Sequence, residues 1–185
     1  MRSRVIVSAA VLAASASMLA AADPQPATGV QTPAIIGTGD VHSAPDATYL
    51  PQQQDEYSIA FSITRASDNP AKINPALREV ARMVNIYTYA GVPLSHLHFV
   101  AVIHEGAIDA ALDSAHYRSK YGIDNPNLPL IRTLRAAGVD VMGSAQSLPT
   151  AQQGGEPVAS DVTLALSGMT ALVDLERKGY SLIQL

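Results

Sequence analysis

The chain has 185 residues, of which 48% are hydrophobic and 15% charged, and its formal net charge is −4. This composition suits one globular domain with attached segments. The acidic balance argues against a nucleic-acid-binding surface, because no basic stripe is present to contact phosphates. The sequence contains no cysteine, which excludes every mechanism that needs a thiol from this chain.

Residues 1–22 are predicted to be a signal peptide. The start "MRSR" is positively charged, the apolar run "VIVSAAVLAASASMLA" follows, and "AAA" precedes Asp23 as at a cleavage site. The apolar run is shorter than the roughly 20 residues of a membrane span. We therefore expect cleavage, export to the periplasm or the exterior, and no membrane span afterwards; an uncleaved anchor is the alternative.

Residues 23–56 are predicted to form an extended or disordered N-terminal arm. They are rich in proline, glycine, threonine and glutamine and show no sustained hydrophobic period. Two apolar pieces, "AII" at 34–36 and "TYL" at 48–50, could dock on the domain or on a neighbouring subunit.

Residues 57–185 are predicted to form an α/β domain. Asn74 and Pro75 are typical of a helix start, and the apolar runs are typical of strands that are covered on both faces. The predicted strands are 57–64, 97–104, 139–142, 162–166 and 180–183. The predicted helices are 75–90, 106–112, 128–138 and 169–179, with an irregular connection at 116–127. This alternation predicts three layers around a mainly parallel five-stranded sheet.

Ligands of parallel sheets bind beyond the carboxyl ends of the strands. Polar side chains follow each of the first four predicted strands, so we expect them to line one candidate pocket. They are Arg65, His104, Glu105, Ser144, Gln146 and Ser167.

Three stretches resemble the exported branch of the DsrE/DsrF-like (YchN-like) family. They are "HFVAVIHEGAIDAAL", "YGIDNPNLPLIRTLRAAGVDVMGSAQSL" and "VTLALSGMTALVDLERKGYSLI", within a resemblance that covers residues 57–185. The resemblance implies a flavodoxin-like domain, assembly with itself or with a related DsrE-like subunit, and, in active members, sulfur transfer through a cysteine persulfide. That cysteine lies at the end of the third strand, in a context like "V-x-V-x-x-C-x-Q-S".

The corresponding turn here is "MGSAQS", which places Ser144 at or next to the position of the cysteine. A hydroxyl is far less acidic than a thiol, whose pKa is about 8.5, and oxygen cannot carry a persulfide. The resemblance therefore implies a non-catalytic binding or scaffolding module. The alternative is a subunit of a sulfur-relay or sulfur-oxidation system whose thiol comes from a partner protein.

A serine hydrolase is a third hypothesis, from a different class. The turn around Ser144 lacks the final glycine of the Gly-x-Ser-x-Gly motif. If the strands follow the order 2-1-3-4-5, strand one separates Ser144 from His104, with about 4.8 Å between neighbouring strands. No complete hydrolase motif is therefore present.

A metal site is not expected at the histidines of the second strand. His98 and His104 lie six residues apart, roughly 20 Å along a strand, whereas a metal needs three or four converging ligands. His96 is expected in solvent and His98 hydrogen-bonded in a half-buried position. No metal or other cofactor is predicted.

The segment "YGIDNPN" contains Asn125 and Asn127. An Asx-turn followed by a helix N-cap explains both residues. An ordered loop beside the site or at a subunit contact is the alternative.

Overall fold

The computed structural model describes residues 29–148 and 157–185. The predicted signal peptide lies outside these residues. Within them, five parallel strands form one sheet, in the order β6-β5-β4-β3-β7. The strands are β3 (Tyr57–Ile63), β4 (Leu97–Ile103), β5 (Asp140–Ser144), β6 (Thr163–Ala165) and β7 (Ser181–Gln184). The parallel sheet flanked by helices confirms the predicted flavodoxin-like α/β class.

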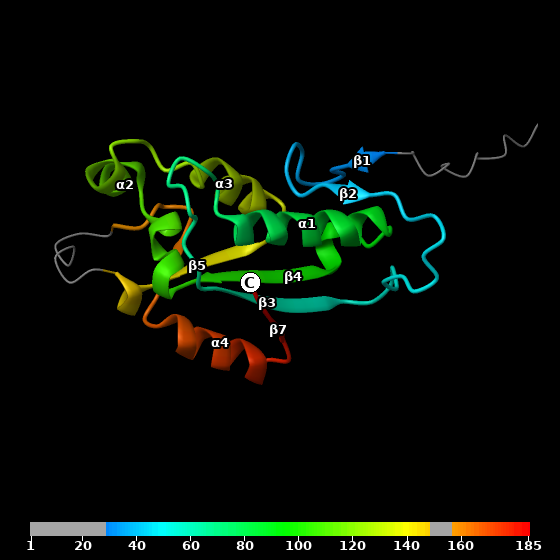
Figure 1. Cartoon of the computed structure of the whole chain (residues 1–185). Coiled ribbons are helices and arrows are strands. Elements are labelled where there is room, and N and C mark those ends of the chain that lie inside the picture. The colour runs from blue at the N-terminus through cyan, green and yellow to red at the C-terminus, as the bar shows by residue number, and fades with distance from the viewer. Residues whose placement is uncertain (1–28, 149–156) are drawn as a thin grey trace, which may run out of the picture.

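The strand order corrects one expectation. The second strand of the domain, β4, lies between the first strand, β3, and the third strand, β5. The order considered from the sequence instead placed the first strand between the second and the third. Parallel strands are joined by right-handed crossovers, so connections on one face of the sheet all step in the same direction. Helices α1 and α3 cover one face of the sheet, and α4 covers the other (Figure 1). The connection through α4 therefore runs in the opposite direction, from β6 at one edge to β7 at the other edge, beside β3.

Helix α1 (Pro75–Tyr89) follows directly from local sequence. Oδ1 of Asn74 accepts a hydrogen bond from the amide of Ala76 at 2.9 Å, and Pro75 occupies the first helical position. Helix α3 (Leu128–Ala136) and helix α4 (Gly168–Arg177) also lie where the apolar period predicts them. Short 3₁₀ helices complete the domain at Leu94–His96, Glu105–Ala111 and Ala145–Ser147.

Helix α2 (Ser114–Tyr121) was predicted as an irregular connection, and that prediction was wrong. Its two ends are capped: Oδ1 of Asp113 accepts from the amide of His116 at 2.7 Å, and Gly122 ends the helix at φ 76°. Of its own residues, Tyr117 alone is buried. A helix with one buried side chain has no apolar stripe, which is why the hydrophobic period did not reveal it.

Helices cover both faces of the sheet (Figure 1), and each face has its own buried apolar core. On the side of α1 and α3, the rings of Phe61 and Phe99 meet edge to face, with centroids 5.4 Å apart. On the other side Val100 and Val102 pack against Leu172 of α4. Within the described residues, none of the helices has the length and apolar character that crossing a bilayer requires.

From residue 29 onward, the N-terminal arm packs on α1. Strands β1 (Val30–Gln31) and β2 (Val41–His42) pair in antiparallel fashion, and Ile35 between them is fully buried in the core. Asn85 of α1, itself fully buried, accepts from the amides of Ala34 and Ile35 at 3.0 and 2.7 Å. Its Nδ2 contacts carbonyl oxygens of the same segment at 2.9 to 3.2 Å. The "AII" piece therefore docks on this domain.

Candidate functional site

The carboxyl ends of β3, β4 and β5 bring three buried polar side chains together: Ser62, His104 and Ser144. Ile103 of β4 pairs with Gly143 of β5. His104 and Ser144 each follow that pair, so they lie level on neighbouring strands, whose spacing is about 4.8 Å. The observed strand order makes neighbours of two residues that the expected order kept apart.

These side chains face α4, because successive residues of a strand point to opposite faces. A side chain at Gly143 would contact Ala111 on the other face, so Ser144 points toward α4. A Cβ built on Gly168, the first residue of α4, would lie 2.7 Å from the Cβ of His104. The helix can begin against the imidazole because this position is a glycine.

His104 is bonded to Ser62. The distance from Nε2 of His104 to Oγ of Ser62 is 2.9 Å, and Oε1 of Glu105 lies 4.0 Å from Nδ1. These are the atoms of a serine–histidine dyad, but both residues are buried and substrate cannot reach the hydroxyl. The bond joins β3 to the end of β4.

Ser144 has no such activation. It is 2% exposed, and among the described residues its hydroxyl has no hydrogen-bond partner. A nucleophilic serine needs a base within hydrogen-bond reach, and Nε2 of His104 is bonded to Ser62. Ser144 therefore lacks both the accessibility and the proton acceptor that nucleophilic catalysis requires.

The turn after β4 is strained at Glu105, whose φ of 52° is in the left-handed region. Its amide donates to Oγ of Ser147 at 2.8 Å, which ties this turn to the one after β5. The side chains of Glu105 and Gln146 are exposed. These two candidate residues lie at the surface, above the buried His104 and Ser144.

Arg65 and Ser167 are the two remaining candidate residues. Arg65 follows β3, is exposed, and lines a cavity of about 500 Å³ together with Gln184 and Leu185. Ser167 precedes α4 without capping it through its side chain. Of the six candidate residues, His104 and Ser144 are thus buried, whereas the other four are exposed or half-buried.

Asparagines form a buried network beside this edge of the sheet. Nδ2 of Asn125 donates to the carbonyl oxygens of Ala110 and Leu112 at 3.1 and 2.6 Å. Its Oδ1 accepts from the amide and from the side chain of Asn127 at 2.9 and 2.8 Å. The bond to the amide is the predicted Asx-turn.

The side chain of Asn127 does not cap the following helix, contrary to the prediction. Its Oδ1 accepts instead from the amide of Asn74 at 2.7 Å, and Nδ2 of Asn74 donates to the carbonyl of Arg65 at 2.9 Å. Asn127 thus bonds to a residue distant in sequence instead of to the first turn of its own helix. The network holds the start of α1 and the loop after β3 together.

A small cavity of about 60 Å³ lies beside this network and is lined by Asp109, Tyr117 and Tyr121, among others. Oδ2 of Asp109 accepts from Lys120 at 2.6 Å and from the hydroxyl of Tyr121 at 2.5 Å. The bond to Asp109 raises the pKa of Lys120. Burial, followed by the bond to Asp109, raises the pKa of Tyr121. Both groups therefore stay protonated near neutral pH. The cluster joins the 3₁₀ helix Glu105–Ala111 to the last turn of α2.

The histidines of the second strand do not converge. His98 was expected to be half-buried; its side chain is 47% exposed, and Nε2 lies 2.5 Å from Oε2 of Glu56 at the surface. Within residues 29–148 and 157–185, no group of three or more histidine, aspartate or glutamate side chains is placed to hold a metal ion.

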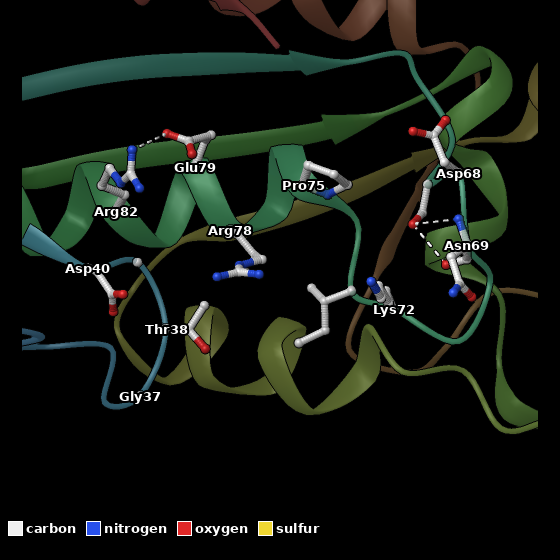
Figure 2. A pocket seen from close by; sticks show the side chains of 13 residues that line it. Gly37, Thr38, Asp40, Asp68, Asn69, Lys72, Pro75, Arg78, Glu79 and Arg82 are labelled. Carbon is white, nitrogen blue, oxygen red and sulfur yellow. Dashed lines mark hydrogen bonds and ion pairs between the residues drawn. The ribbon is translucent and has the colours of Figure 1, made fainter.

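The sequence did not indicate a larger cavity of about 700 Å³ between the arm, the loop before α1 and α1 itself. Figure 2 shows Arg78 pointing into it from the helix, between Thr38 of the arm and Lys72 of the loop. Sequence alone provides little indication of this cavity, because its lining residues are scattered along the chain and the arm was predicted to be extended or disordered. Docking of the arm creates the cavity.

A known protein family matches the α/β domain. The model of the DsrE/DsrF-like family matches residues 57–185. Among solved structures, the chain is similar to MTH1491, a protein of unknown function from Methanobacterium thermoautotrophicum, with 15% identity and a TM-score of 0.49. That match covers 70% of this chain and 100% of the other. A search of the curated proteins finds no match. Because the family model spans well over half of the sequence, this chain belongs to the DsrE/DsrF-like family.

Proposed function

We propose that this chain is an exported, non-catalytic member of its family that acts as a self-associating binding or scaffolding module. The observation that carries the proposal is Ser144. It stands at or next to the position that resembles the sulfur-carrying cysteine of the family, is buried, and has no hydrogen-bonded base among the described residues. The sequence supplies no cysteine elsewhere. The leader-like residues 1–22 support export to the periplasm or beyond.

Substitution of Ser144 tests the non-catalytic role. Ser144→Ala should change the free energy of unfolding by no more than about 1 kcal/mol, because the lost hydroxyl has no hydrogen-bond partner among the described residues. In Ser144→Cys the thiol should be buried and its pKa raised. We expect this thiol to accept the sulfane sulfur of glutathione persulfide, with release of glutathione thiolate. The reaction should be at least about 100-fold slower than that of Gln146→Cys, because a buried thiol reacts only when the surrounding structure opens locally.

Gln146→Cys is the matched control, because residue 146 lies two positions further along the same turn and is exposed. The material should be mature protein, whose first residue mass spectrometry should identify as Asp23. Equal rates for the two thiols would contradict the proposal. So would ester hydrolysis by the unmodified protein that Ser144→Ala abolishes.

Self-association is proposed through the outer surface of α4. Met169 and Val173 lie one turn apart and are 64% and 54% exposed, and Leu166 just before the helix is 77% exposed. Among the described helices, α4 alone covers its side of the sheet (Figure 1). Apolar side chains gathered on an exposed surface are typical of protein interfaces. A second copy of the chain is the occupant that we propose.

The double substitution Met169→Glu and Val173→Glu should convert an oligomer into a monomer in sedimentation velocity, because association would bury like charges. Ile36→Glu is the control, since Ile36 is a 77% exposed isoleucine on the arm. It should leave the oligomer unchanged. A monomeric unmodified protein, or an oligomer that survives the double substitution, would refute this interface.

The family match over residues 57–185 also favours the second candidate, a sulfur-relay or sulfur-oxidation subunit with a partner's thiol. Purification of the native protein distinguishes the two. A stoichiometric DsrE-like subunit that carries a cysteine would support the relay role, whereas a homo-oligomer supports the module.

A further inference from the structure

The 700 Å³ cavity contains charged groups without partners. Lys72 from the loop and Arg78 from α1 line it, and no carboxylate of the described residues lies within ion-pair distance of either. Arg82 differs, since it is paired with Glu79 at 3.5 Å. Two cations from different elements are therefore free to bind a ligand.

Two carboxylates of the same cavity are also free. Asp40 lies on the arm and Asp68 on the loop before α1, and neither forms an ion pair with any described residue. A simple anion would bind Lys72 and Arg78 but would lie near both carboxylates. A simple cation would bind the two carboxylates but would lie near Lys72 and Arg78. A ligand with one group of each sign can satisfy both pairs.

The walls of the cavity are held in place before any ligand arrives. Gly39 has φ 76°, and a Cβ built on it would lie 2.4 Å from the backbone nitrogen of Arg82, so the arm lies directly against α1. Asn85 fixes the same segment through its hydrogen bonds. At the other end, Asn74 fixes the start of the helix. Such preorganisation lowers the cost of binding.

We propose that this cavity binds a small zwitterion of the amino-acid or short-peptide class. The ligand's carboxylate contacts Arg78 and Lys72, and its ammonium group contacts Asp40 or Asp68. Arginine suits this role because its guanidinium can donate two parallel hydrogen bonds to a carboxylate. The volume of about 700 Å³ falls within the range of small-molecule sites, and a tripeptide fits within it. This proposal names a ligand for the proposed binding module but does not depend on the α4 surface.

Calorimetric titration with three related peptides tests the proposal. Trialanine carries both terminal charges, N-acetyl-trialanine retains the carboxylate alone, and trialanine amide retains the ammonium alone. We expect trialanine to bind and each capped peptide to bind at least tenfold more weakly. Equal binding of the acetylated peptide would identify an anion site and overturn the proposal, as would no binding of trialanine at millimolar concentration.

Substitutions locate the site. Arg78→Gln should weaken trialanine at least tenfold while leaving the thermal unfolding temperature unchanged, because Arg78 is exposed. Arg132→Gln, at an exposed arginine of α3 outside the cavity, should bind as the unmodified protein does. Equal losses in both variants would overturn the assignment. The cavity is lined by residues of α1, and α1 and α4 lie on opposite sides of the sheet (Figure 1), so this test and the sedimentation test can fail separately.

Discussion

Asn125→Ala is expected to lower the free energy of unfolding by about 3 kcal/mol, among the larger effects of a single substitution. The side chain is buried and donates to the carbonyls of Ala110 and Leu112. It also accepts two bonds from Asn127. Alanine leaves these groups buried and unpaired, and each such group costs about 1–3 kcal/mol.

Denaturant unfolding followed by circular dichroism measures this loss. Asp124→Ala is the matched control at the preceding position, where the side chain is exposed and pairs with Arg118 at the surface. Its cost should stay below about 1 kcal/mol. Asn125→Asp separates the two halves of the contact, because it retains an acceptor for Asn127 but places carboxylate oxygens against the two carbonyls. Asn125→Asp with the stability of the unmodified protein would show that the donated bonds contribute nothing.

Asn85→Ala is expected to release the arm from α1 and to destabilise the protein by about 2–3 kcal/mol. The substitution removes the acceptor for the amides of Ala34 and Ile35 and the donor to the carbonyls of Thr38 and Gly39. Release would expose Ile35, which is buried in the core. Hydrogen exchange at the amides of Ala34 and Ile35 should become at least 30-fold faster, since about 2 kcal/mol corresponds to that factor.

Gln54→Ala serves as the control, because Gln54 is an exposed amide side chain in the same arm. Its substitution should leave exchange at Ala34 and Ile35 unchanged. Release of the arm also removes one wall of the 700 Å³ cavity, so Asn85→Ala should lose trialanine binding. Unchanged exchange at these two amides would show that Asn85 does not hold the arm.

Much of the fold could be predicted because its signals are local. Asn74 and Pro75 start α1 through a side-chain bond and a preset φ angle. The apolar run of β4 is buried along both faces from Phe99 to Ile103, as a central parallel strand requires. Helix α2 escaped prediction because its signals are two caps rather than an apolar stripe.

The candidate site was less predictable, because burial and pairing depend on residues far apart in sequence. Ser144 and His104 were both selected for their place after a strand. Their actual chemistry depends on two residues far away in the sequence. Ser62, 42 residues from His104, is hydrogen-bonded to its Nε2, and Gly168 allows α4 to begin against the imidazole. The positive φ of Glu105, which shapes the turn after β4, could not be predicted from the sequence.

The sequence by itself determined the parallel α/β class, the positions of most strands and helices, and the absence of cysteine. These features follow from residue identity and from the spacing of apolar residues over a few positions. The tertiary structure alone decided the strand order, the burial of Ser144, the attachment of the arm through Asn85 and the cavity that this attachment forms. The physical reason is that each of these depends on contacts across tens of residues, where the crossover direction and the shape of the packed core select the partners.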